Sequence, residues 1–271
     1  MPARYPERIV CLTEETTETL YLLGEERRIV GISGYTVRPA RARREKPRVS
    51  AFLSARTEKI LELRPDLVLG FSDLQADIAR DLAKAGLNIL LFNQRSVDEI
   101  LSMILTLSAM VGAAEKGGAL VQSLERGLDH IREEARAFPR RPRVYFEEWD
   151  EPMISGIRWV SELIGIAGGD DVFAELSLSA GATGRIVQQG EEVIRRQPDV
   201  ILASWCGKKF RPEKVAARPG WDAIPAVRAS RLHEIKSADI LQPGPAALTD
   251  GVRRMHEIFR DFVSRGPRTP P

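Results

Sequence analysis

Segment 146–156, Phe-Glu-Glu-Trp-Asp-Glu-Pro-Met-Ile-Ser-Gly, carries four acids in five consecutive positions: Glu147, Glu148, Asp150 and Glu151. Closely spaced carboxylates can transfer protons as a general acid and base, or bind a hard cation through their oxygens. The segment follows an expected strand, and acids at a strand end are more often solvated. We therefore interpret it as a loop of solvated acids, with acid–base or cation chemistry as the alternative.

A thiol near several cations forms the second candidate for chemistry. Cys206 lies in segment 204–211 together with Lys208, Lys209 and Arg211. Neighbouring cations lower the pKa of a thiol and can permit contact with a metal such as cobalt. Because the sequence offers no partner ligand for a lone cysteine, this role stays the less favoured interpretation.

The usual motifs of catalysis and metal binding do not occur in the sequence. No Gly-rich phosphate loop, GxSxG nucleophile elbow or CxxC pair is found. The three histidines have neither HxH nor HExxH spacing; they are His130, His233 and His256. We therefore predict no catalytic residue, no metal site, no required cofactor and no enzymatic activity.

Two further acids stand at equivalent places in a sequence repeat. The stretch TEKILELRPDLVLG at 57–70 recurs 133 positions later as GEEVIRRQPDVILA at 190–203. Glu58 and Glu191 each stand seven residues before a Pro-Asp pair that leads into an apolar strand. The duplication indicates two similar α/β lobes with an acid at the same place in each. This arrangement suits a two-lobed receptor better than a single-site enzyme.

Apolar periodicity and turn residues predict strands that alternate with helices along both halves of the chain. In the first half, strands are expected at 9–12, 28–32, 67–69 and 89–92, and helices at 15–23, 58–63, 74–85 and 97–111. In the second half, strands are expected at 143–147, 200–203 and 232–235, and helices at 159–167, 191–196 and 245–263.

The predicted fold class is α/β, with two Rossmann-like lobes of mostly parallel sheets and a ligand cleft between the lobes. A continuous helical pattern at 114–138 would span roughly 36 Å and join the lobes as one long backbone helix. The predicted parts are an N-terminal lobe at 1–113, the helix at 114–138, a C-terminal lobe at 139–265 and a frayed tail at 266–271.

Composition excludes some classes of partner. Forty basic against 38 acidic residues among 271 give a net charge of +2, so nucleic acid is not an expected partner. No apolar stretch reaches the roughly 18 residues of a membrane span, so no membrane insertion is expected. Segment 1–8 lacks the apolar region of a signal peptide, which predicts a cytoplasmic chain unless an export signal has been trimmed away.

Several segments resemble the class III periplasmic binding proteins, and the resemblance covers nearly the whole chain. The segments are RIV at 8–10, TTE at 16–18, LG at 23–24, VGISGY at 30–35, the two repeats, AGG at 167–169 and QPGP at 242–245. The family binds cobalamin, iron-siderophores or haem for ABC importers, and its cobalamin-binding branch is the most similar. The resemblance implies a ligand held between two lobes with little hinge motion.

The same resemblance implies a role for the repeated acids. In such receptors one surface glutamate per lobe docks onto arginines of the importer's membrane subunits, and Glu58 and Glu191 match those positions. Two separated carboxylates, each paired with arginine, would fix the orientation of a two-fold partner. The alternative is that both are first-turn glutamates stabilised by the helix dipole.

Ligand contacts are expected where loops leave the strand ends. A large planar ligand requires aromatic and apolar walls with a few polar groups. The predicted contacts are Thr13, Glu14, Tyr35, Arg38 and Phe52 from the first lobe, and Trp149, Met153, Trp159, Arg185, Trp205, Cys206, Lys208, Asp239 and Gln242 from the second. For Trp159, at the start of an apolar helix, packing is the favoured role.

The resulting prediction is a monomeric, non-enzymatic solute-binding protein whose ligand is a corrinoid and whose partner is an ABC importer. Two positions depart from the family pattern: Ala246 replaces a frequent arginine, and Phe52 stands where cobalamin binders have tryptophan. The alternatives are a ferric-siderophore or haem receptor, which Arg38 and Arg185 keep open, and a cytoplasmic corrinoid carrier, sensor or salvage protein.

Overall fold

The computed structural model describes residues 4–51 and 54–264, so Phe52 and the predicted tail at 266–271 lie outside the described residues. The chain divides into two compact units. Unit 1 comprises Met1–Gln94, Asp98–Leu124 and Gln242–Pro245, and unit 2 comprises Arg95–Val97, Glu125–Leu241 and Ala246–Pro271.

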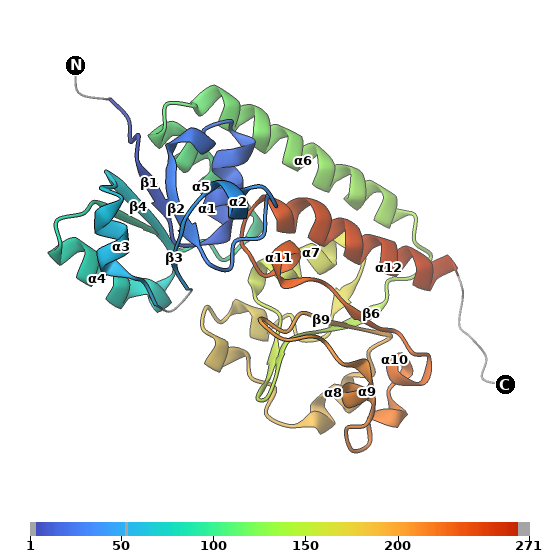
Figure 1. Ribbon diagram of the computed structural model, residues 1–271. Coiled ribbons are helices and arrows are strands. Elements are labelled where there is room, and N and C mark those ends of the chain that lie inside the picture. Colours follow the sequence, from blue (N-terminus) through green and yellow to red (C-terminus); the bar gives the residue numbers. More distant parts are fainter. Residues whose placement is uncertain (1–3, 52–53, 265–271) are drawn as a thin grey trace. The chain divides into compact units, whose positions relative to one another are not determined.

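Unit 1 is built on a five-stranded, entirely parallel sheet, which we call sheet 1 (Figure 1). Its strands, in their order across the sheet, are β3 (Arg48–Ser50), β2 (Ile29–Ser33), β1 (Ile9–Cys11), β4 (Leu67–Phe71) and β5 (Ile89–Phe92). Strands β1 and β4 are buried throughout, as expected for the centre of a helix-covered parallel sheet. Strand β3 was not predicted, because its sequence Arg-Val-Ser contains a single apolar residue.

Helices connect the strands of sheet 1, and side chains from both form the core. The helices are α1 (Glu14–Leu22), α2 (Ala42–Glu45), α3 (Thr57–Glu62), α4 (Ala76–Lys84) and α5 (Val97–Met110), with the 3₁₀ helices η1 (Glu26–Arg28) and η2 (Asp73–Gln75). Val10 and Val68 from the central strands pack with Ile60 of α3 and Leu82 of α4. The predicted strands and helices of the first half are thus confirmed, with each end within two residues of its prediction.

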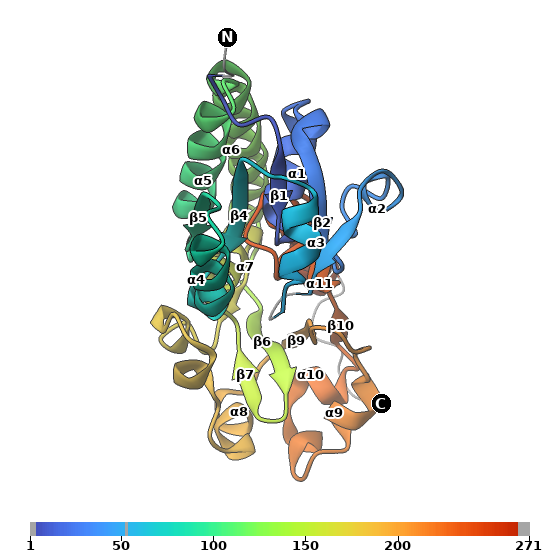
Figure 2. The ribbon, with the colours of Figure 1, turned by 60° about the vertical axis from the view of Figure 1, so that its left-hand side comes forward.

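Unit 2 contains a second sheet, sheet 2. Its strands, in their order across the sheet, are β10 (Leu232–Glu234), β9 (Val200–Ala203), β6 (Arg143–Asp150) and β7 (Met153–Ser155), and β8 (Asp170–Asp171) also pairs with β6. All pairs are parallel except β6–β7, an antiparallel hairpin visible in Figure 2. The prediction of a loop at 146–156 was therefore wrong, because β6 continues through three of the four acids to Asp150.

Short helices surround sheet 2. They are α7 (Arg158–Ala167), α8 (Gly190–Arg196), α9 (Pro212–Ala216), α10 (Pro225–Arg228), α11 (Ser237–Ile240) and α12 (Val252–Ser264), with the 3₁₀ helices η3 (Leu176–Leu178), η4 (Ala182–Arg185) and η5 (Trp221–Ala223). The helix predicted at 245–263 is confirmed: residues 245–246 are α-helical, a π-helical turn, η6 (Ala247–Gly251), follows, and α12 continues it to Ser264.

The long helix predicted at 114–138 is α6 (Ala114–Arg136), the longest ribbon in Figure 1. Its buried stripe includes Leu124, Leu128 and Ile131. Residues 114–124 belong to unit 1 and residues 125–136 to unit 2, while the division of the chain at 113 and 138 stays a prediction. Along the described chain, no helix combines the length and apolarity that crossing a bilayer requires.

The two sheets share one connectivity. In sheet 1 the chain passes from β1 to its neighbour β2, and later to β4 on the other side of β1, followed by β5. In sheet 2 it passes from β6 to β8, and later to β9 on the other side of β6, followed by β10. The strand order thus reverses between β1 and β4 and between β6 and β9.

The sequence repeat occupies the same topological place in each unit. Helix α3 enters β4 and helix α8 enters β9, with Glu58 and Glu191 as the second residue of their helices. Arg64 (φ 45°) and Gln197 (φ 43°), each directly before the repeated proline, both adopt the left-handed conformation. The repeat therefore encodes one helix–turn–strand geometry twice.

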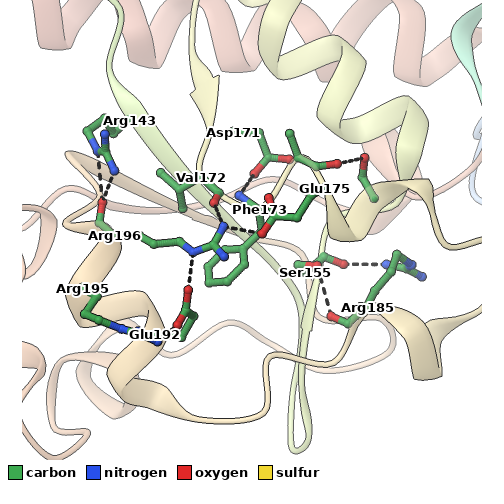
Figure 3. Close-up of polar contacts among 12 residues, drawn as sticks. Arg143, Ser155, Asp171, Val172, Phe173, Glu175, Arg185, Glu192, Arg195 and Arg196 are labelled. Carbon is green, nitrogen blue, oxygen red and sulfur yellow. Dashed lines mark hydrogen bonds and ion pairs between the residues drawn. The ribbon is translucent and has the colours of Figure 1, made fainter.

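An arginine and an aspartate lock this geometry in both units, and we call the arrangement the Arg–Asp clasp. The backbone N–H of Arg8 donates to Asp66 Oδ1 and that of Arg143 donates to Asp199 Oδ2, both at 3.0 Å. Each guanidinium donates back to a carbonyl at the end of the helix, at 2.6 Å on Leu63 and 2.7 Å on Arg196. Figure 3 shows the second of these bonds. The clasp satisfies helix carbonyls that would otherwise need water.

Candidate functional site

Open parallel sheets bind ligands outside the carboxyl ends of their strands, at the point where the strand order reverses. In unit 1 this rule selects the residues that follow β1, β2 and β4, which we call edge 1. In unit 2 it selects those that follow β6, β9 and β10, which we call edge 2. Most predicted ligand contacts lie on these two edges. The expected cleft between the lobes stays a prediction.

The centre of edge 1 is the first turn of α1. Thr13 stands at the N-cap position in extended conformation, but its hydroxyl accepts no backbone N–H of the helix and instead donates to Glu15 Oε1. Glu14 Oε1 accepts the N–H of Val37, which follows β2, at 3.1 Å. All three polar residues at 13–15 are buried, and Glu15 Oε2 is buried without a hydrogen-bond partner.

Burial changes the protonation of these two acids. Desolvation raises the pKa of Glu14 from 4.5 to about 7, partly offset by the hydrogen bond from Val37. Desolvation likewise raises the pKa of Glu15 to about 7, partly offset by the hydrogen bond from Thr13. Near pH 7 each group can therefore act as a hydrogen-bond acceptor or, when protonated, as a donor.

The loop after β2 brings an exposed aromatic ring and an ion pair to edge 1. Tyr35 is 59% exposed and Val37 is 37% exposed. Arg38 Nε donates to Glu18 Oε1 of α1 at 2.9 Å, with the two side chains 31% and 11% exposed. The predicted contacts Glu14, Tyr35 and Arg38 therefore belong to one continuous edge.

The turn after β4 is part of edge 1 but was missed in the sequence. Ser72 has a positive φ of 67°, and its hydroxyl accepts the N–H of Leu74. This turn leaves Leu74 61% exposed, while buried Gln75 accepts the N–H of Phe71 at 3.0 Å. The missed signal was Ser-Asp-Leu directly after an apolar strand, which resembles an ordinary helix start.

Segment Gln242–Pro245 belongs to unit 1 although it lies far along the chain. Gln94 Nε2 donates to the carbonyl of Pro243 at 2.9 Å. A Cβ added to Gly244 would lie 2.5 Å from Glu15 Cβ, so only glycine permits this approach. The segment therefore lies against α1 at Glu15, and the predicted contact Gln242 within it is half-buried.

A buried carboxylate, that of Glu147, supports edge 2 through its hydrogen bonds. Glu147 of β6 is 0% exposed and accepts two hydrogen bonds from Arg218, at 2.6 and 3.0 Å. Its oxygens also accept Trp205 Nε1 and Tyr145 OH, both at 3.0 Å. Burial and then the Glu147 charge raise the pKa of Tyr145 well above its ordinary value. The prediction of a solvated acid was thus wrong for Glu147. The side chain of Trp205, a predicted ligand contact, is also packed in the interior and only 3% exposed.

A lysine bridges two indole rings on edge 2. Lys208 Nζ lies 4.3 Å from the centroid of Trp149 and 5.1 Å from that of Trp205, and it pairs with Asp150. The ammonium is thus held by cation–π contacts and a carboxylate together. Trp149 is half-buried and Cys206 is exposed. Four predicted contacts therefore lie together here: Trp149, Trp205, Cys206 and Lys208.

Arg185 forms its hydrogen bonds with the hairpin of β6 and β7. Its side chain is 3% exposed, and its terminal nitrogens donate to both oxygens of Glu148 at 2.6 and 3.1 Å. One of them also donates to the carbonyl of Ser155 in β7, a contact drawn in Figure 3. The interpretation of Arg185 as an anion-binding residue therefore has to be corrected. Met153, half-buried at the start of β7, accepts the N–H of Val187 with its carbonyl at 2.8 Å.

Two further predicted contacts, Trp159 and Asp239, lie in helices of unit 2, one of them buried and the other half-buried. Trp159 is 3% exposed, and its indole N–H donates to the carbonyl of Ile240 at 2.9 Å, which confirms that packing is its role. Asp239 lies half-buried in α11, after β10.

The two repeated acids are exposed, and neither carboxylate has an ion-pair partner within the ranges 4–51 and 54–264. Glu58 and Glu191 occupy the first turns of α3 and α8, which precede β4 and β9. Both carboxylates are therefore exposed at equivalent places in the two units.

A groove of about 450 Å³ also opens in unit 2, but it lies at the opposite end of sheet 2 from edge 2. Its lining includes Val200, the first residue of β9, and Ser230 and Arg231, which precede β10. None of the predicted ligand contacts lines it. The groove is therefore separate from the candidate site.

A family comparison agrees with this architecture. Residues 9–238 match the model of a family described as periplasmic binding protein. The match begins with β1, ends in α11, and includes both edges and both copies of the repeat.

Individual relatives extend the comparison. An uncharacterized ABC transporter substrate-binding lipoprotein, YvrC of Bacillus subtilis, is 26% identical over 94% of this chain and 81% of its own length. A vitamin B12-binding protein of Yersinia pestis is 27% identical over 80% of this chain and 75% of its own. The crystal structure of a possible iron-binding, periplasmic solute-binding protein from Staphylococcus epidermidis has a TM-score of 0.81 at 20% identity, covering 94% and 99% of the two chains.

Proposed function

Because this chain belongs to the periplasmic binding protein family, we propose that it binds a corrinoid such as cobalamin without converting it and delivers it to an ABC importer. Members of the family are solute-binding proteins, and one relative of this chain is a substrate-binding component of an ABC transporter. The similarity to a vitamin B12-binding protein over most of the chain supports the choice of ligand.

The observation that carries the proposal is the exposed apolar surface of edge 1. Tyr35 and Leu74 are 59% and 61% exposed, and both follow carboxyl ends of strands in sheet 1. Large exposed apolar side chains at a strand-end edge are typical of a binding surface rather than of a packed core. A corrin ring offers flat apolar faces for such residues and a rim of amides for the polar groups beside them.

Titration of the purified protein with cyanocobalamin tests the proposal directly. All four tryptophans lie in unit 2, and Trp149 is half-buried on edge 2, so ligand binding there should quench intrinsic fluorescence. Corrin absorption bands should also remain with the protein after desalting. Failure of cyanocobalamin and cobinamide to bind at high micromolar concentration would overturn the proposal.

A matched pair of variants assigns the surface. Tyr35→Ser and Leu74→Ser should each weaken corrinoid binding about tenfold, since each removes roughly 1.4 kcal/mol or more of apolar contact. Leu105→Ser changes a comparably exposed leucine, 43% exposed on α5, and should leave binding unchanged. Equal affinities of all three variants would remove edge 1 from the ligand site.

Delivery to an importer is tested through the repeated acids. Exposed carboxylates in equivalent places of two similar units suit a partner that presents two arginine sites. Glu58→Arg and Glu191→Arg should therefore reduce uptake through the cognate importer in proteoliposomes, while leaving corrinoid affinity unchanged. Glu62→Arg, on the same helix as Glu58, is the control for a charge reversal outside the repeat position.

A further inference from the structure

Three of the predicted ligand contacts are cations, and their partners in the structure indicate which ligands the site favours. The sequence left open an anionic chelate held by Arg38 and Arg185, since arginine pairs readily with oxyanions, and it placed Lys208 among the ligand contacts. In the structure each of the three already pairs with a carboxylate of its own unit: Glu18, Glu148 and Asp150 respectively.

These carboxylates are poorly placed to be replaced by a ligand. Their side chains are 11%, 22% and 9% exposed for Glu18, Glu148 and Asp150. An anionic ligand that displaced one of them would leave a largely desolvated carboxylate without its cation. Such an uncompensated charge would oppose binding of the anionic ligand.

The remaining buried charge on edge 1 is acidic. Glu14 accepts a backbone N–H and Glu15 accepts a hydroxyl, and neither carboxylate has an ion-pair partner among residues 4–51 and 54–264. Arg43, which acts on Glu14 through space, is exposed on α2. Glu15 is 1% exposed and its Oε2 has no hydrogen-bond partner, although buried carboxylate oxygens normally have one. Such an oxygen is suited to accept from a ligand amide, hydroxyl or cationic N–H.

We propose that these pairings make the site favour neutral or cationic ligands over anionic ones. This inference rests on the proposed function as a solute-binding protein, and it names the ligand class of that site. Neutral cobalamin, cationic cobinamide and cationic ferric hydroxamates satisfy the charge rule. Ferric tricatecholates, which carry three negative charges, and haem, which carries two propionates, do not.

Equilibrium binding of four probes tests the rule: cyanocobalamin, ferrioxamine B, a ferric tricatecholate and haemin. At least one of the first two should bind ten times more tightly than either anionic probe. Binding of ferrioxamine B without cyanocobalamin would overturn the corrinoid function but support the charge rule. A tricatecholate or haemin that binds as tightly as the neutral and cationic probes would overturn the charge rule, and so would the absence of binding by all four.

Variants test the mechanism separately in each unit. Glu18→Gln removes the carboxylate paired with Arg38, and Asp150→Asn removes the one paired with Lys208. Each should increase affinity for the ferric tricatecholate about fivefold or more, since it leaves a cation for the ligand. Adding Arg38→Met to Glu18→Gln should abolish that increase.

Glu62→Gln is the control for loss of an exposed charge, and thermal melting of each variant establishes that it is folded. Unchanged tricatecholate affinity in both folded single variants would overturn the assignment.

Discussion

Arg218 holds Glu147 through both of its terminal nitrogens, at 2.6 and 3.0 Å, although the Glu147 side chain is completely buried. The carboxylate accepts four hydrogen bonds in total, because Trp205 and Tyr145 donate to it as well. A buried carboxylate is stable only when its oxygens are fully hydrogen-bonded and its charge is paired. This network therefore fixes β6 and the loop after β9 as one support for edge 2.

Glu147→Gln should destabilise the protein by about 3–5 kcal/mol, because the new amide N–H₂ would face the donors that surround Glu147 and leave Arg218 without its counter-charge. Urea unfolding followed by tryptophan fluorescence measures the loss. Glu151→Gln, which changes an exposed acid of the same hairpin, should shift the unfolding free energy by less than about 0.5 kcal/mol. Similar values for the two variants would contradict the role assigned to the network.

Much of the fold could be predicted from the sequence, because its signals are local. The buried strands β1, β4 and β9 are continuous apolar runs, and α6 carries a long apolar stripe between its charges. The repeat by itself indicates two similar units. The structure adds that its Pro-Asp pair carries the Arg–Asp clasp in each unit.

The candidate site was predicted less completely, because its chemistry depends on contacts between distant residues. Glu147 and Arg218 are 71 positions apart, and Arg185 and Glu148 are 37 apart. Local sequence could not indicate that these charges are paired and buried, so the acids of 146–151 looked solvated and Arg185 looked available for a ligand. Leu74 was missed because its exposure follows from the backbone turn at Ser72, which has a positive φ.

Arg143→Met should weaken the Arg–Asp clasp of unit 2. The variant removes two hydrogen bonds to the carbonyl of Arg196 at the end of α8, at 2.7 and 3.0 Å. A loss of about 1–2 kcal/mol in the free energy of unfolding is expected. Because every tryptophan lies in unit 2, intrinsic fluorescence during urea unfolding reports on this unit. Arg195→Met, an exposed arginine of the same helix, should change little, and equal effects would argue against the clasp.

Stability should fall as the pH rises through the range in which Glu15 titrates. Its pKa is raised from 4.5 to about 7 in the folded protein, so the folded state holds the proton more tightly than the unfolded state. The contribution of the group to stability is therefore fully present below about pH 4.5, and it is lost as the pH rises to about 7. Glu14 acts in the same sense.

Glu15→Gln should remove part of this pH dependence. At pH 8 the variant should be more stable than the wild type by on the order of 1 kcal/mol, and at pH 4.5 the two should be equal. Urea unfolding at several pH values provides the measurement. Glu191→Gln, an exposed glutamate, is the control and should follow the wild-type curve. A wild-type stability that rises between pH 5 and pH 7 while the Glu15→Gln curve runs parallel to it would contradict the assignment.

Adjacent glycines of α6 should respond oppositely to the same substitution. A Cβ on Gly117 would lie 1.9 Å from Ser108 Oγ and 2.3 Å from Ser108 Cβ, so α5 and α6 must separate to admit it. Gly117→Ala should therefore destabilise by about 1–3 kcal/mol. A Cβ on Gly118 meets no atom within 4 Å, and Gly118→Ala should stabilise by up to about 1 kcal/mol through helix propensity. Thermal melting of the two alanine variants measures the difference. Ser108→Gly in the Gly117→Ala background should recover part of the lost stability, because it removes Ser108 Oγ and Cβ. Equal melting temperatures for the two alanine variants would show that α5 and α6 do not pack this closely.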